Sequence, residues 1–229
     1  MDLIILIGGI GTTGDLLAET RKFHQEKWTD DLVMLPNYLH KKLPSQLTYA
    51  SAGKVGGAPI ICGGVDGIVP WSVTDKCWTL VADYTHWKVM PSMLKKRAKA
   101  AHFSNGQIFI VAGGEDGNGA AIKTAEMFSD GKWSLISDLL IATKGYRAFH
   151  LHRSSHKSLT LIFRACFVTA DKDNLLMLGG SFNPSGNVKY NIPTNTWSSL
   201  PDLPFKVERG ACITSKLPGM ECYVFILYW

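Results

Sequence analysis

The sequence contains glycines spaced as in a nucleotide-binding loop. Gly9, Gly11 and Gly14 follow an apolar run, precede a helix-like stretch, and match G-x-G-x-x-G, the pattern of loops that hold a dinucleotide pyrophosphate. A nicotinamide dinucleotide site also needs an acidic residue at the end of the next strand, about 20 residues later, to bind the ribose. Asp30 and Asp31 instead precede the next strand-like run. We therefore expect no dinucleotide cofactor.

Three histidines and several isolated acids are the other groups that could do chemistry. His150, His152 and His156 could bind a metal, but they have no cysteine or carboxylate partner in the pattern. No G-x-S-x-G, H-E-x-x-H or C-x-x-C sequence occurs. The isolated acids are expected to be turn residues: Asp66, Glu115 and Asp116. These observations predict no bound metal, no cofactor and no catalytic activity.

A glycine pair closes an apolar run four times along the chain. The pairs are Gly8-Gly9, Gly63-Gly64, Gly113-Gly114 and Gly179-Gly180. A tryptophan follows each pair after 17 to 23 residues, and the four are Trp28, Trp87, Trp133 and Trp197. Arginines follow in three of the four units, at Arg97, Arg164 and Arg209. Chance does not keep such a register four times, so the chain contains an internal repeat.

Each unit is expected to fold as four short antiparallel strands. In the third unit these are 101–104, 108–112, 122–128 and 132–137, with a hairpin turn at Asn105-Gly106. The glycine pair after the second strand would adopt positive φ or let another backbone approach closely. A sheet of this kind buries both of its faces only when it packs against copies of itself.

The glycine pair, the spaced aromatic pair and the downstream arginine together resemble the kelch repeat, a unit of about 50 residues. The resemblance covers residues 3 to 228. It implies an all-β protein, a kelch-type β-propeller in which the repeated glycines, tryptophans and arginines are architectural. It also implies an aromatic residue before each fourth strand, matched by Tyr84, Phe128, Tyr190 and, less closely, Phe23. The first unit departs from the pattern, with Lys41-Lys42 near the place of the arginine.

The repeat divides the single domain, residues 1–229, into about four four-stranded blades plus a partial fifth. The units span approximately 3–47, 48–99, 100–146, 164–208 and 209–229. Residues 148–163 have no counterpart in other units, and are either a loop insertion or an error in the gene model. The chain begins at a second strand and ends on a second strand. We therefore expect an incomplete ring, although a strand near 211–214 could instead pair with the Leu3 strand and close four blades.

The resemblance implies a non-catalytic protein-protein interaction module. In kelch propellers the loops after the glycine pairs and the turns after the tryptophans share one face, where family members bind partners, and loops on a rigid scaffold vary freely. The residues expected to contact the protein partner are Asp66, Asp116, Asn118, Asn183, Ser185, Lys95, Lys96 and Lys206. The resemblance also allows a carbohydrate-active or oxidase-type kelch enzyme, or the substrate-recognition part of a ubiquitin-ligase adaptor whose other domains are missing.

The charge and hydropathy patterns argue against two other kinds of partner. The net charge of +5 is spread along the chain, and its short basic runs, such as Lys95-Lys96-Arg97, are typical of solvated loops, so we expect no nucleic acid partner. The longest apolar run, residues 3–7, is far shorter than the ~18 residues of a membrane span, so we expect no membrane insertion. No basic segment precedes this run, and the sequence as it stands indicates a cytoplasmic protein.

Two of the five cysteines could form a disulfide. If Cys62, at the end of a second strand, faces Cys77 in the third, then Ile60 faces Thr79 and the hairpin is centred in the loop between them. Facing residues have Cα atoms about 4.5 or 5.5 Å apart, and a disulfide can span both distances. Two buried, reduced cysteines are the alternative. A bridge would indicate an oxidising, extracellular route and a signal segment absent from this sequence.

Overall fold

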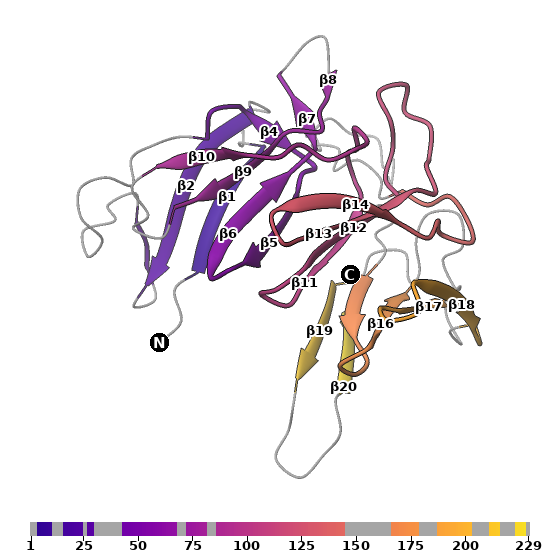
Figure 1. Ribbon diagram of the computed structural model, residues 1–229. Helices are drawn as coiled ribbons and strands as arrows, with labels where there is room; N and C mark the ends of the chain where they lie inside the picture. The colour runs from indigo at the N-terminus through magenta and orange to yellow at the C-terminus, as the bar shows by residue number, and fades with distance from the viewer. Residues whose placement is uncertain are drawn as a thin grey trace, which may run out of the picture.

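The computed structural model describes residues 4–10, 16–24, 27–29, 43–67, 72–81, 86–144, 166–178, 187–202, 211–215 and 223–227. These residues form antiparallel sheets and turns without a helix, so the expected all-β class is confirmed for them. Figure 1 shows the sheets following one another in chain order, from indigo to yellow. Within the same residues, no helix could serve as a membrane span.

Three sheets have four strands in simple sequence order. The second sheet contains β5 (Ser51–Val55), β6 (Ala58–Cys62), β9 (Cys77–Leu80) and β10 (Trp87–Met90). The third contains β11 (Ala101–Ser104), β12 (Phe109–Ala112), β13 (Ala125–Ser129) and β14 (Lys132–Ile136). The fourth contains β15 (Cys166–Thr169), β16 (Asn174–Leu178), β17 (Asn187–Asn191) and β18 (Thr196–Leu200).

The remaining strands form smaller sheets. The first sheet contains β1 (Ile4–Ile10), β2 (Leu16–His24) and β3 (Lys27–Thr29). At the C-terminal end, β19 (Ala211–Ser215) pairs with β20 (Tyr223–Leu227). A short sheet of β4 (Leu47–Thr48), β7 (Val65–Asp66) and β8 (Ser72–Val73) lies beside the second sheet. The helix-like stretch after the first glycine pair is thus a strand, β2, antiparallel to β1, and the strand-turn-helix of a dinucleotide site does not form there.

The third sheet shows how closely local sequence predicts this fold. Its first two strands meet at the expected turn, where Gly106 has φ 92° and the Asn105 side chain accepts hydrogen bonds from the amides of Gln107 and Ile108. The third strand begins at Ala125, three residues later than expected. The residue before it, Thr124, is hydrogen-bonded to the glycine pair instead. The Gly113 amide donates to the Thr124 carbonyl at 3.0 Å.

The core lies between consecutive sheets. The first strands of neighbouring sheets contact one another, β5 with β11, β11 with β15, and β15 with β19. Ile60 and Cys62 of the second sheet pack with Phe109 of the third, and Ile110 of the third packs with Tyr190 of the fourth. Each four-stranded sheet therefore buries its faces against its neighbours, as the repeat requires.

The tryptophans of the repeat lie at these junctions. Trp87, Trp133 and Trp197 are buried. The Trp133 indole N–H donates to the carbonyl of Pro91 at 3.0 Å, and that of Trp197 donates to Ser137 at 2.8 Å, so each reaches the sheet before its own. The residue opposite the tryptophan is Phe23, Leu80, Phe128 and Tyr190 in the four sheets. Leu80, rather than Tyr84, therefore occupies the aromatic position of the second unit.

Candidate functional site

The ends of the second strands and of the fourth strands lie on the same side of each sheet. In an antiparallel sheet of four strands in sequence order, the second and fourth strands run in the same direction. The loops after β6 and β12 therefore emerge beside the turns after β10 and β14. We call this side the doublet face, and define it by residues 63–67, 91–99, 113–124 and 137–144.

The glycine pairs hold the turns of the doublet face against the sheets. Gly64 and Gly114 have φ of 92° and 97°, and a Cβ on Gly114 would lie 2.6 Å from the Ala98 carbonyl oxygen. The Gly64 amide donates to the Arg97 carbonyl and the Gly114 amide to the Thr143 carbonyl, both at 2.8 Å. Both of the expected reasons for glycine, positive φ and close backbone approach, therefore hold at these positions.

Arg97 joins the second and third sheets from inside the protein. Its guanidinium donates to the carbonyls of Gly113 at 2.8 Å and Thr124 at 2.7 Å, and to the Glu126 carboxylate at 2.5 Å. Both charged side chains are fully buried. Glu126 also accepts the amides of Leu94 at 2.5 Å and Lys95 at 3.0 Å. One ion pair thus fixes the turn after β10 onto the start of β13.

Burial lowers the pKa of Arg97, and the Glu126 carboxylate opposes this effect by its charge and its hydrogen bond. Such a pair positions the backbone and offers no free group for acid-base chemistry. In the third unit Thr143 occupies the equivalent position. Its carbonyl accepts a hydrogen bond from the Gly114 amide, as the Arg97 carbonyl accepts one from the Gly64 amide. Arg164 and Arg209 lie outside the described residues, as do Gly179 and Gly180.

A second charged cluster holds the loop after β12. The Glu115 carboxylate pairs with the ammonium groups of Lys99 and Lys144, the latter at 3.3 Å, and all three side chains are nearly buried. Lys144 also donates to the Gly119 carbonyl at 2.5 Å, and Lys99 lies 5.2 Å from the centre of the Tyr49 ring. These contacts close the 115–119 loop over the glycine pair, so Glu115 has a structural role beyond that of an ordinary turn residue.

The residues expected to bind a protein partner fall into three groups. Asn118, Lys95 and Lys96 are exposed on the doublet face. Asp66 accepts a hydrogen bond from the Ser45 hydroxyl, and Asp116 accepts the amides of Asn118 and Ala120, both at 2.9 Å. The two aspartates therefore shape their loops. The third group lies outside the described residues and comprises Asn183, Ser185 and Lys206.

Cys62 and Cys77 face each other across β6 and β9, in the predicted register that also pairs Ile60 with Thr79. Their Cα atoms are 4.2 Å apart and their sulfur atoms are 2.12 Å apart, a disulfide distance. Both cysteines are buried, in the same cluster as Met93. The bridge would therefore lie directly beneath the turn that carries the exposed lysines Lys95 and Lys96.

Two further ionisable groups have shifted pKa values. Burial raises the pKa of Tyr190 to about 12, and its hydroxyl donates to Asn195 at 3.0 Å. A hydrogen bond from the Asn174 side chain lowers the pKa of the Asp171 carboxyl. Within the described part of the chain, no three histidine, cysteine or acidic side chains are grouped to hold a metal. His150, His152 and His156, with the rest of residues 148–163, lie outside that part.

Sequence reasoning missed the residues that rigidify this face. Glu126 could have been found, because it lies two residues before the core residue Phe128 and so on the same side of its strand, where a buried carboxylate needs a cationic partner. Lys99 and Lys144 carry no comparable signal, since their pairing depends on how two turns meet.

Comparisons with known proteins address the fold alone. No family model matches the chain, and no curated protein matches it. A solved structure described as "Structure of YjhT" superposes with a TM-score of 0.70 at 11% sequence identity, covering 99% of this chain and 81% of that chain. At this identity the similarity is one of fold.

Proposed function

We propose that the chain is a kelch-type β-propeller that binds a protein partner through the doublet face, without catalysis. Three four-stranded sheets in sequence order, with contacts between the first strands of successive sheets, support the propeller arrangement. The similarity of fold to YjhT over 99% of the chain also supports it. In this proposal the first four sheets are blades and the β19–β20 pair is part of a fifth, while the short sheet of β4, β7 and β8 is not a blade of its own.

The observation that carries the binding proposal is the rigid support of an exposed polar loop. Asp116 and Lys144 fix the backbone of residues 115–120, while Asn118 and Ala120 at its tip are exposed. A loop held in one conformation loses little entropy when it binds, and this favours recognition of a partner. The ionisable groups around the loop form ion pairs with one another, as expected of a scaffold.

The test compares two exposed residues on opposite ends of the same sheet. Asn118→Arg alters the doublet face, and Gln107→Arg is the control in the turn between β11 and β12. Each full-length variant is used to capture protein from a cell extract of the source. We expect a stoichiometric partner that Gln107→Arg retains and Asn118→Arg loses. Equal retention by both variants, or turnover of a sugar or alcohol substrate by the wild-type chain, would contradict the proposal.

We also propose that the protein matures in an oxidising compartment. The disulfide distance between Cys62 and Cys77 supports this, because such bridges persist chiefly in secreted and periplasmic proteins. The cytoplasmic interpretation of the sequence is the alternative, and requires both thiols to be reduced. Alkylation of the denatured, unreduced chain, which counts its free thiols, distinguishes the two.

A further inference from the structure

Large aliphatic side chains are exposed at the tips of two neighbouring turns of the doublet face. Leu94, in the turn after β10, is 51% exposed, and Leu140 and Ile141, in the turn after β14, are 43% and 50% exposed. The residue before each tip, Met93 or Leu139, is buried at 3% or 2%. Each turn is thus anchored by a buried apolar residue, Met93 or Leu139, and exposes the leucine that follows it to solvent.

The two turns form one continuous surface because both are hydrogen-bonded to the segment 123–126, one through the Glu126 side chain and the other through the Lys123 backbone. Leu94 and Lys95 donate their amides to Glu126. Three residues earlier, the Lys123 carbonyl accepts the amide of Leu139 at 2.9 Å. Residues 123–126 therefore lie between the turns and hold them side by side.

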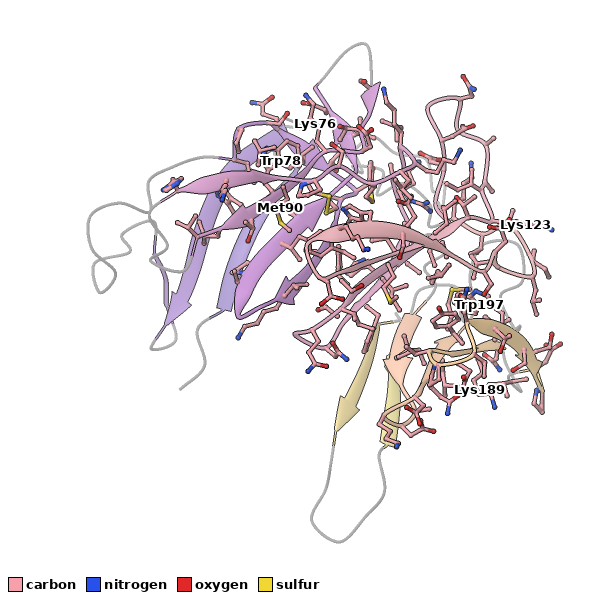
Figure 2. The ribbon with its side chains drawn as sticks, viewed as in Figure 1. Lys76, Trp78, Met90, Lys123, Lys189 and Trp197 are labelled. Carbon is pink, nitrogen blue, oxygen red and sulfur yellow. A yellow bond between two sulfur atoms is a disulfide. The ribbon has the colours of Figure 1, made fainter. Side chains whose placement is uncertain are left out.

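Lysines surround the exposed aliphatic residues. Lys95 and Lys96 follow Leu94 directly and are exposed. Lys123, between the turns, is also exposed, and Figure 2 shows it at the periphery of the molecule. The exposed acid in this region is Asp138, so the balance is basic. We call the set of Leu94, Lys95, Lys96, Lys123, Leu140 and Ile141 the turn patch.

We propose that the turn patch adsorbs to an anionic lipid surface, with its three aliphatic side chains entering the interface and its lysines contacting the headgroups. Exposed aliphatic residues beside lysines are the combination that binds at membrane interfaces without spanning them. Protein hot spots instead favour tryptophan, tyrosine and arginine, with leucine under-represented, and lysine is depleted at protein interfaces. The composition of the turn patch therefore favours lipid over a second protein.

This inference goes beyond the proposed function. It gives Lys95 and Lys96 a second role and leaves the 115–120 loop to the protein partner. The net charge of +5 adds a general attraction to an anionic surface. A chain held at the membrane by its turns would present the adjoining loop along the bilayer surface.

The experiment measures sedimentation of the full chain with phosphatidylcholine vesicles, with and without phosphatidylserine. We expect binding to the phosphatidylserine vesicles alone, and its loss at about 1 M salt, where the Debye length falls to about 3 Å. Each lysine close to an anionic surface contributes about fivefold in affinity, so Lys95→Gln with Lys96→Gln should weaken binding about 30-fold. Leu94→Ser with Leu140→Ser should also abolish most of the binding.

Matched controls remove the same number of side chains elsewhere. Lys132→Gln with Lys172→Gln removes two exposed lysines from the opposite ends of the sheets. Val89→Ser with Leu135→Ser removes two exposed aliphatic residues, 71% and 54% accessible, from β10 and β14. Both control pairs should bind like the wild type. Equal binding to neutral and anionic vesicles, no binding to either, or equal losses in patch and control variants would overturn the proposal.

Discussion

Replacing Arg97 by methionine tests the contact that joins the second and third sheets. The substitution keeps an unbranched side chain of similar reach but removes the donors to the carbonyls of Gly113 and Thr124 and to the Glu126 carboxylate. Glu126, fully buried in the wild type, then loses its cationic partner and keeps two backbone amides as its hydrogen-bond donors. Removing one member of a buried ion pair costs about 3–5 kcal/mol, a large share of the roughly 5–15 kcal/mol that stabilises a typical domain.

A double variant separates the ion pair from simple loss of packing. Glu126→Gln removes the buried charge, and its amide oxygen can replace one of the two carboxylate oxygens that accept the Leu94 and Lys95 amides. Arg97→Met combined with Glu126→Gln should therefore lose about 0.5–3 kcal/mol less than the sum of the single variants. Lys132→Met, at an exposed lysine, is the control and should stay within about 0.5 kcal/mol of the wild type.

Equilibrium unfolding in urea measures these differences as changes in the free energy of unfolding at constant slope. A loss of less than about 1 kcal/mol for Arg97→Met would refute the reasoning, because an uncompensated buried carboxylate costs more than that. If the losses in free energy of unfolding of the two single variants were strictly additive, the reasoning would also be refuted, since residues joined by an ion pair are energetically coupled.

Three further predictions concern the glycine pairs, the cysteines and Tyr190. Gly114→Ala should destabilise the protein by more than about 1 kcal/mol, because its Cβ would meet a carbonyl 2.6 Å away, whereas Gly117→Ala, with open space, should be near neutral in the same urea assay. Alkylation of the denatured, unreduced chain should label three of five thiols, and five labelled thiols would exclude the Cys62–Cys77 bridge. Stability should fall between pH 10 and about 12, because the folded state keeps Tyr190 protonated while the unfolded state ionises; Tyr190→Phe should flatten that window in alkaline unfolding curves.

The elements of this fold could be predicted because they depend on local sequence. The turn at Asn105-Gly106 and the facing pair Cys62 and Cys77 follow from hairpin chemistry and from the pairing rule of antiparallel strands. The late start of β13 could not be predicted in this way. It depends on hydrogen bonds between the glycine pair and residues 122–124 of the same unit, which no local sequence pattern signals.

The same distinction separates the site residues that sequence reasoning found from those it missed. Asn118 lies at a loop tip, as a polar residue flanked by glycines suggests. Thr143 holds the place of an arginine in the third unit because the repeat requires the backbone carbonyl there, whatever the side chain. The exposure of Leu94 and Leu140 could not be predicted, since aliphatic residues in a turn are equally compatible with burial.

Native-state hydrogen exchange tests the central claim that the glycine pairs lock the turns into a rigid doublet face. The amides of Gly64, Gly114 and Leu94 donate to Arg97, Thr143 and Glu126 across separate segments of the chain. If the account holds, these three amides exchange as slowly as those of β12, through opening of the whole domain. Exchange of the same amides at the rate of the exposed Lys96 amide, while β12 stays protected, would contradict it.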